Sequence, residues 1–98
     1  MMRVSAGIVR YPDGRILICR RGEGRKNAHL WEFPGGKQEA GESSEDALRR
    51  ELLEELSLPI ADISPLCRRE AQGIAFDFLT ATATRAPVLT EQDRKSVV

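Results

Sequence analysis

The chain has 98 residues, a length that suits one small domain with a limited core. Its 15 basic residues balance 15 acidic ones, so bulk charge draws it neither to a nucleic acid polymer nor to a membrane surface. No apolar run is long enough to span a bilayer, and the N-terminus lacks the long apolar core of a signal peptide.

The first 20 residues alternate strand-like and turn-like segments. Residues 3–10 (RVSAGIVR) and 15–20 (RILICR) are rich in β-branched and apolar side chains and predict two strands. Between them, residues 11–14 (YPDG) are a strong turn signal, so we expect the two strands to form a hairpin. Cys19 and, later, Cys67 lie in strand-like segments without metal-ligand spacing, which predicts buried free thiols in a cytoplasmic protein.

Residues 21–29 (RGEGRKNAH) are polar and contain glycine, which predicts an exposed loop. The loop and the residue before it carry four cations: Arg20, Arg21, Arg25 and Lys26. These cations either face solvent or hold phosphate oxygens of a ligand. On the second interpretation, Arg21 is a candidate substrate-binding residue.

Residues 30–33 (LWEF) predict a short strand that ends at Pro34-Gly35-Gly36. Glycine lets the backbone approach a ligand closely, so the carbonyl of Gly36 is a candidate metal ligand. Phe33 is either a core residue or the face on which a nucleobase stacks. Lys37, directly after the glycines, either reaches a phosphate of the substrate or stays exposed to solvent.

Residues 36–58 (GKQEAGESSEDALRRELLEELSL) predict a loop that turns into a helix. The helix is expected to begin after Ser43 or Ser44, both good N-cap residues, and Ser43 with Asp46 fits a capping box. Three leucines recur at four-residue spacing and predict a buried stripe. They are Leu48, Leu52 and Leu56.

Glu51, Glu54 and Glu55 lie beside that stripe, within roughly a quarter to a third of the helix circumference. Like charges at such spacings destabilise a helix by roughly 0.2–0.5 kcal/mol per pair. Either the three side chains form a solvated acidic face, or a divalent cation joins them. Carboxylate oxygens are the hard ligands that Mg²⁺ or Mn²⁺ prefers, so three carboxylates meeting at one point are a candidate metal site.

Two segments after the helix predict a pair of strands. Residues 60–69 (IADISPLCRR) predict a loop and then a strand that Pro65 interrupts. Residues 73–84 (GIAFDFLTATAT) alternate and predict a central strand that pairs with the preceding one. Arg68 and Asp77 either point toward a ligand or are ordinary outward polar positions.

The spacing within residues 36–58 gives a more specific indication. Gly36 is followed after five residues by Glu42 and, after seven more, by residues 50–58 (RELLEELSL). This pattern resembles the Nudix box, which reads Gly, five residues, Glu, seven residues, then Arg-Glu-apolar-any-Glu-Glu-any-Gly-apolar. Only Ser57 departs from it, since the pattern has Gly at this position. Gly there adopts the left-handed conformation that ends the helix, so we expect Ser57 to lower the stability of the fold modestly.

The run LWEFPGGKQEAGE also resembles the entry to the box in MutT-type members of the family. The resemblance implies one Nudix domain over residues 1–98, in which an α/β/α sandwich surrounds a mixed sheet. Members usually continue through another strand and a C-terminal helix, whereas residues 85–98 read as a loop. We therefore expect this final strand and helix to be missing, through truncation or because a second subunit covers the sheet, which leaves monomer and homodimer open.

The resemblance further implies Mg²⁺-dependent hydrolysis of a nucleoside triphosphate, of the oxidised purine or cytidine type, to the monophosphate and pyrophosphate. Metal ligands carried over by matching position are Gly36, Glu51, Glu54 and Glu55. Glu54 would also act as the base or orient the attacking water. The alternative is a non-catalytic or incomplete Nudix module that binds nucleotide weakly or needs a partner chain.

Two further roles follow from matching positions in the family. Arg50 is expected to pair with Glu42 or another carboxylate of the box and so to fix the geometry of the metal ligands. Arg50 is thereby counted with Glu51 and Glu54 among the candidate catalytic residues. Glu91 is an additional candidate carboxylate near the metal.

Overall fold

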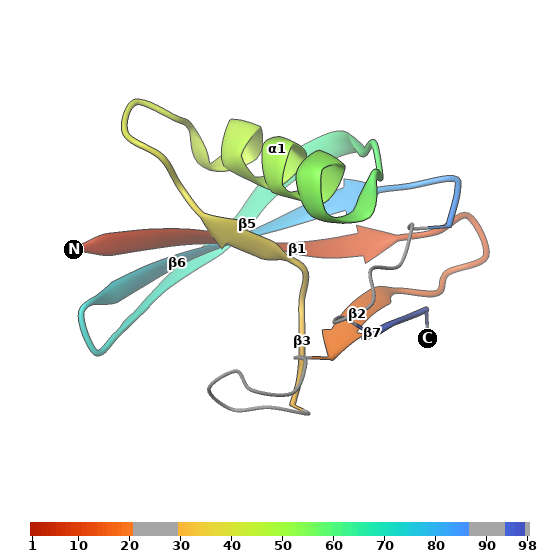
Figure 1. Ribbon diagram of the computed structural model, residues 1–98, viewed down its shortest axis with the longest axis horizontal. Coiled ribbons are helices and arrows are strands. Elements are labelled where there is room, and N and C mark those ends of the chain that lie inside the picture. The colour runs from red at the N-terminus through yellow and green to blue at the C-terminus, as the bar shows by residue number, and fades with distance from the viewer. Residues whose placement is uncertain (21–29, 87–93, 98) are drawn as a thin grey trace.

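Seven strands and one helix make up the part of the chain that the computed structural model describes, residues 1–20, 30–86 and 94–97. In chain order they are β1 (Met2–Arg10), β2 (Leu17–Arg20), β3 (Trp31–Glu32), β4 (Gly35–Lys37), α1 (Ser44–Leu56), β5 (Ala61–Ala71), β6 (Ile74–Thr82) and β7 (Arg94–Val97). Figure 1 shows their arrangement. None of the described helices is long and apolar enough to cross a membrane.

The strands form two sheets. In the larger one, of order β4-β1-β6-β5, strand β1 runs parallel to β6 and antiparallel to β4, and β5 runs antiparallel to β6. The smaller sheet, of order β3-β2-β7, is antiparallel throughout. The expected mixed sheet is therefore confirmed, and β6 is an inner strand that pairs with β5, as predicted.

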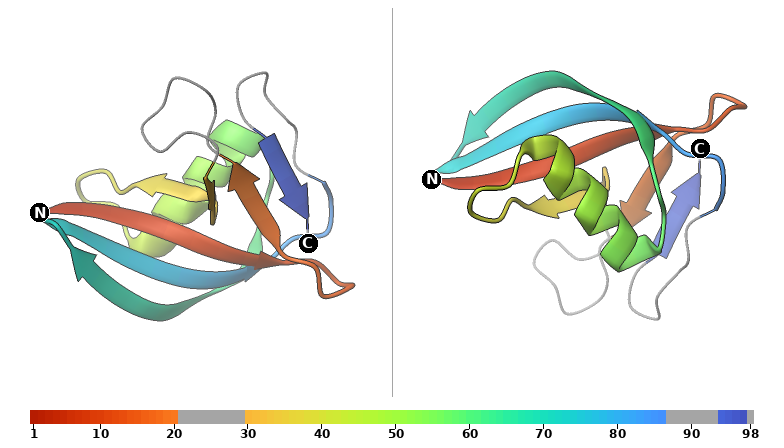
Figure 2. Two further views of the ribbon diagram at one scale, coloured as in Figure 1. Left: turned by 90° about the horizontal axis from the view of Figure 1, so that it is seen from below. Right: turned by 90° about the horizontal axis from the view of Figure 1, so that it is seen from above.

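Helix α1 covers one face of the larger sheet, as the two views of Figure 2 show. Its predicted start is confirmed, because the hydroxyl oxygen of Ser43 accepts a hydrogen bond from the backbone N–H of Asp46 (3.1 Å). The predicted stripe is confirmed as well: Leu48, Leu52 and Leu56 are at most 1% exposed. They join Val9, Leu17, Leu58 and Leu79 in one core cluster between helix and sheet.

The helix ends at Ser57, whose backbone is left-handed (φ 49°, ψ 36°). The N–H of Ser57 donates to the carbonyl of Leu53, and the N–H of Leu58 donates to the carbonyl of Leu52, both at 3.1 Å. The bond from left-handed Ser57 to Leu53 is that of the αL C-cap motif, and the two bonds together satisfy carbonyls at the helix end. The left-handed geometry expected at this position is confirmed; with a Cβ present it is disfavoured by about 1–2 kcal/mol.

Strands β1 and β2 do not form the predicted hairpin. The predicted turn is present, since the N–H of Gly14 donates to the carbonyl of Tyr11 (2.9 Å). Beyond it, a single bridge joins Arg10 to Ile16, and the two strands then enter different sheets. Both edges of β1 pair with other strands, β4 and β6, so β2 pairs elsewhere.

Two segments that were predicted as loops are strands. Gly35–Lys37 forms β4 and pairs with β1, and Arg94–Val97 forms β7 and pairs with β2. The expectation of a loop throughout residues 85–98 is therefore wrong for Arg94–Val97, and a strand does follow β6. Both strands are short and lack the apolar alternation that marks a strand in sequence, because the edges of β1 and β2 determine their conformation.

Strand β5 continues through Pro65, where an interruption was predicted. The sheet accommodates the proline by a register shift between Pro65 and Cys67. Proline is tolerated here because β5 is an edge strand. The same edge position explains why Cys67 is exposed, contrary to the prediction of a buried thiol, whereas Cys19 is buried as predicted.

We expect Leu52→Ala to lower the free energy of unfolding by about 2–5 kcal/mol, because Leu52 is 1% exposed and its loss leaves a cavity between helix and sheet. Leu53→Ala is the matched control, since Leu53, the next residue along the helix, is 46% exposed. Its effect should be about 1 kcal/mol or less. Denaturant unfolding of both variants checks this, and equal losses would contradict the described packing.

Candidate metal and phosphate site

Strand β4 lies against helix α1, and Gly36 contacts the helix at Glu51. A Cβ atom built onto Gly36 would lie 2.6 and 2.7 Å from the two carboxylate oxygens of Glu51, closer than van der Waals contact allows. Only glycine leaves room for the Glu51 side chain at this point. The strand backbone and a helix carboxylate thus meet where the sequence predicted two metal ligands.

Arg50 ties the loop after β4 to the helix. Its Nε donates to Oε2 of Glu42 (2.7 Å) and its Nη2 donates to Oε1 of the same carboxylate (2.9 Å), which is a bidentate ion pair. Nη2 also donates to the backbone carbonyl of Lys37 (3.0 Å), and Glu42 accepts from the N–H of Glu39 (2.9 Å). The predicted pairing of Arg50 with Glu42 is confirmed.

The remaining nitrogen of Arg50 brings two further carboxylates together. Nη1 donates to Oε1 of Glu51 (3.0 Å) and to Oε2 of Glu54 (3.2 Å). In the described ranges, no three His, Cys, Asp or Glu side chains gather closely enough to hold a metal ion. The expected meeting of three carboxylates is therefore not found. Instead, Glu51 and Glu54 converge on the guanidinium of Arg50, and the side chain of Glu54 is 61% exposed.

The donor set nevertheless fits a divalent cation. The carboxylates of Glu51 and Glu54, from two successive turns of the helix, both lie within about 3 Å of Arg50 Nη1. Both therefore reach one shared cationic group. The oxygens are hard ligands, and the Glu51 carboxylate lies directly against the backbone of Gly36 on β4. Glu55, on the same helix, is exposed.

The Arg50–Glu42 pair is charged across the neutral pH range. The guanidinium of Arg50 and, to a smaller extent, the N–H of Glu39 lower the pKa of Glu42 from an ordinary value of 4.5 to about 2. The carboxylate of Glu42 in turn raises the pKa of Arg50. The pair therefore stays charged well below the ordinary pKa of a glutamate side chain.

The remaining predicted site residues lie at the surface or outside the described residues. Phe33 is 40% exposed, so it is not a core residue. Trp31 is half-exposed, and the guanidinium of Arg20 lies 6.0 Å from its ring centroid, a cation–π contact. Lys37 is exposed on β4, whereas Arg21 and Glu91 fall outside the described residues.

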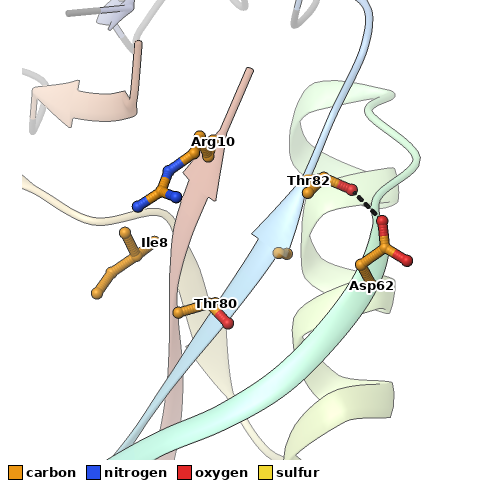
Figure 3. Close-up of a pocket in the computed structure, with 6 residues that line it drawn as sticks. Ile8, Arg10, Asp62, Thr80 and Thr82 are labelled. Carbon is orange, nitrogen blue, oxygen red and sulfur yellow. Dashed lines mark hydrogen bonds between the residues drawn. The ribbon is translucent and has the colours of Figure 1, made fainter. Parts of the chain in front are cut away.

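Two hollows among the described residues lie apart from each other, since they share no lining residue. The one beside β4 measures about 320 Å³ and contains two predicted site residues among its lining: Met1, Met2, Arg3, Lys37, Gln38, Glu39, Ala40, Gly41 and Glu42. The other, of about 200 Å³, is shown in Figure 3 and is lined by Ile8, Arg10, Asp62, Thr80, Ala81 and Thr82. It contains no predicted site residue, and the hydroxyl of Thr82 donates to Asp62 there (2.9 Å).

Gln38 is a residue of this region that sequence reasoning missed. Its side-chain Nε2 donates to Ser5 Oγ (3.1 Å) on β1 and to Asp77 Oδ2 (2.7 Å) on β6. No local pattern marks it, because both partners come from strands distant in sequence. Only the register of the sheet, which places Ser5 and Asp77 side by side near β4, would have indicated Gln38.

Comparison with known proteins places these features in a family. The family model described as the NUDIX domain matches residues 1–94. The 8-oxo-dGTP diphosphatase of Haemophilus influenzae is 48% identical over 58 residues, which are 59% of this chain and 43% of that protein. The CTP pyrophosphohydrolase of Escherichia coli is 48% identical over 58 residues, 59% of this chain and 42% of that protein. The matched segment thus spans less than half the length of these relatives.

A solved structure agrees over nearly the whole chain. It comes from a structure and function analysis of MutT from Aliivibrio salmonicida and Vibrio cholerae. It superposes with a TM-score of 0.87 at 34% sequence identity and covers 99% of this chain and 78% of that one. The arrangement of helix and sheets described above is therefore that of a solved structure of this family.

Acid should weaken the fold partly through Glu42. Its pKa in the folded chain, about 2, lies below its ordinary value of 4.5, so its contribution to stability is present above about pH 4.5 and is lost as the pH falls toward 2. We expect the free energy of unfolding to fall more steeply between pH 5 and pH 2 in the wild type than in Glu42→Gln. Denaturant titrations at stepped pH check this, with the exposed Glu70→Gln as control; parallel curves for wild type and Glu42→Gln would contradict it.

Gly36→Ala should reduce divalent-metal binding while the fold persists. The added methyl group would overlap the Glu51 carboxylate and displace it. We expect a loss of roughly 10–100-fold in Mn²⁺ affinity, the range typical for displaced ligand geometry. Gly41→Ala is the control, because it has open space but a backbone φ of +78°, and so strains the loop without touching Glu51. Equal Mn²⁺ affinities of Gly36→Ala and wild type would count against this placement of the site.

Proposed function

The chain belongs to the Nudix domain family, and we propose that it hydrolyses a nucleoside triphosphate to the monophosphate and pyrophosphate with Mg²⁺ or Mn²⁺. The observation that carries this proposal is the convergence of Glu51 and Glu54 on one nitrogen of Arg50, with the Glu51 carboxylate against the backbone of Gly36. Nudix hydrolases in general use divalent metal ions. Relatives named as an 8-oxo-dGTP diphosphatase and a CTP pyrophosphohydrolase support the class of substrate.

The metal would be held by four groups of this chain: the carboxylates of Glu51, Glu54 and Glu55 and the carbonyl of Gly36. When bound, it neutralises charge on the polyphosphate and allows phosphate oxygens to approach a site made of carboxylates. Phosphoryl transfer then depends mainly on positioning and charge neutralisation rather than on a protein nucleophile.

The side chains around the metal ligands have separate tasks. Arg50, anchored on Glu42, holds Glu51 and Glu54 on one side of the helix. Glu54, with 61% of its side chain exposed, has access to solvent and orients or deprotonates the attacking water. Lys37 lines the larger hollow and contributes a positive charge toward phosphate oxygens.

The nucleobase of the substrate is assigned to the surface around Phe33. Phe33 is 40% exposed and lies two residues before β4, so a nucleobase that stacks on its ring is adjacent to the proposed metal ligands. The two curated relatives share 48% identity with this chain over 58 residues although they are named for different nucleotides. We infer that the shared segment serves hydrolysis, and that both oxidised purine and cytidine triphosphates are substrates to test.

A second candidate is a folded Nudix module that binds nucleotide without hydrolysing it. The observation that favours it is the position of Arg50 Nη1 between Glu51 and Glu54. A guanidinium that keeps both carboxylates when metal is added would leave too few ligands for catalysis. Nucleotide binding without product release would support this candidate.

A nucleotide panel tests the proposal. With Mg²⁺ present, we expect pyrophosphate release from 8-oxo-dGTP, CTP or both, and a decrease of about 10²-fold or more in Glu54→Gln, because a group that moves or positions a proton contributes at least that much. Glu45→Gln, an exposed glutamate in the first turn of the same helix, is the matched control and should keep wild-type activity. Release by the wild type no faster than by Glu54→Gln would refute the proposed hydrolysis.

A further inference from the structure

A row of four residues crosses the larger sheet and begins at Gly36. In the register of the strands, Gly36 of β4 pairs with Ser5 of β1, Ser5 pairs with Asp77 of β6, and Asp77 pairs with Arg68 of β5. Residues directly opposite on neighbouring strands share a face of the sheet. For this row it is the face under α1, since Ser5 Oγ donates to the carbonyl of Ser44 (2.9 Å) at the start of the helix.

Hydrogen bonds connect the row to the loop after β4. The Asp77 carboxylate accepts from Arg68 Nε on Oδ1 (2.6 Å) and from Gln38 Nε2 on Oδ2 (2.7 Å). Gln38 Nε2 also donates to Ser5 Oγ (3.1 Å), and Ser5 continues the chain of bonds to Ser44. The network therefore joins three strands of the sheet, β1, β6 and β5, and the residue directly after β4 to the first residue of α1.

Asp77 is the centre of the network. Its residue is 8% exposed and Ser5 is fully buried, so the polar groups lie between sheet and helix. A carboxylate in such a place destabilises the fold unless its oxygens are paired, and an apolar residue would serve stability at least as well. Both oxygens of Asp77 are paired, and one partner, Gln38, comes two residues after the backbone that approaches Glu51.

We propose that Asp77 is a positioning residue for the metal-binding segment Gly35–Gln38. By holding Gln38 directly, and Ser44 through Gln38 and Ser5, it sets the position of β4 relative to the helix that carries Glu51 and Glu54. The inference rests on the proposed metal site. Arg50, itself paired with Glu42, fastens the same segment from the solvent side at the carbonyl of Lys37, so Asp77 and Arg50 hold it from two sides.

The test uses Asp77→Asn and Gln38→Ala in the full chain. Asn keeps the shape of Asp77 but replaces an accepting oxygen by an NH₂ group, so Arg68 or Gln38 loses its acceptor. We expect Mn²⁺ affinity to fall about 10-fold or more in each variant, at a temperature where both remain folded. The double variant should lose no more than the larger single loss, because both changes break one network.

The matched control is Asp62→Asn. Asp62 also binds a neighbouring strand of this sheet, through the hydroxyl of Thr82 (2.9 Å), but it lies on β5 six residues before Arg68, the β5 member of the Gly36 row. Its Mn²⁺ affinity should equal that of the wild type. A second readout needs no metal: hydrogen exchange of the Gln38 backbone N–H, which donates to the carbonyl of Arg3 (2.9 Å), should be faster in Asp77→Asn and unchanged in Asp62→Asn.

The outcomes separate this proposal from the proposed function. A lower free energy of unfolding in Asp77→Asn, with unchanged Mn²⁺ affinity and unchanged exchange at Gln38, would overturn the positioning role. Additive losses in the double variant would overturn it as well. Wild-type chain that binds Mn²⁺ but releases no pyrophosphate would contradict the proposed hydrolysis, while a weaker Mn²⁺ affinity and faster Gln38 exchange in Asp77→Asn would still support the positioning role.

Discussion

The guanidinium of Arg50 is the group on which the site depends, because it contacts every part of the chain that meets there. It holds the loop through Glu42, the strand β4 through the carbonyl of Lys37, and the helix through Glu51 and Glu54. A planar group with five donors suits this task, whereas an ammonium lacks the fork geometry that pairs with a carboxylate at two points. Loss of Arg50 would leave several carboxylates close together without a counter-charge.

Arg50 occupies this position because of the apolar side of its own helix. Leu48, Leu52 and Leu56 are buried in the core, and this fixes the rotation of α1 about its axis. At 100° per residue, Arg50 and Glu51 are then directed to the edge of the sheet where β4 lies. Hydrophobic burial thus sets the coarse position of the site. Polar contacts set the fine position, with Arg50 on the solvent side and the Ser5–Asp77–Gln38 network on the sheet side.

The features that sequence predicted well are local ones. The cap at Ser43, the leucine stripe and the left-handed end at Ser57 each depend on residues within two turns of the helix. The Arg50–Glu42 pair was also foreseen, because the spacing of the box implies it. Features that depend on distant partners were missed: the absence of a β1–β2 hairpin, the strand β4, the exposure of Cys67 and the role of Gln38. Strand pairing across the chain decides each of these, and a single sequence does not reveal it.

The central claim is that helix α1 and strand β4 together form a divalent-metal site. A crystal structure of the chain with Mn²⁺, with anomalous scattering recorded for manganese, tests it most directly. We expect an anomalous peak about 2 Å from carboxylate oxygens of Glu51 and Glu54, with Arg50 still paired to Glu42 and its Nη1 withdrawn from at least one of the two ligands. A manganese peak only at other residues, with Arg50 still bridging Glu51 and Glu54, would contradict the account.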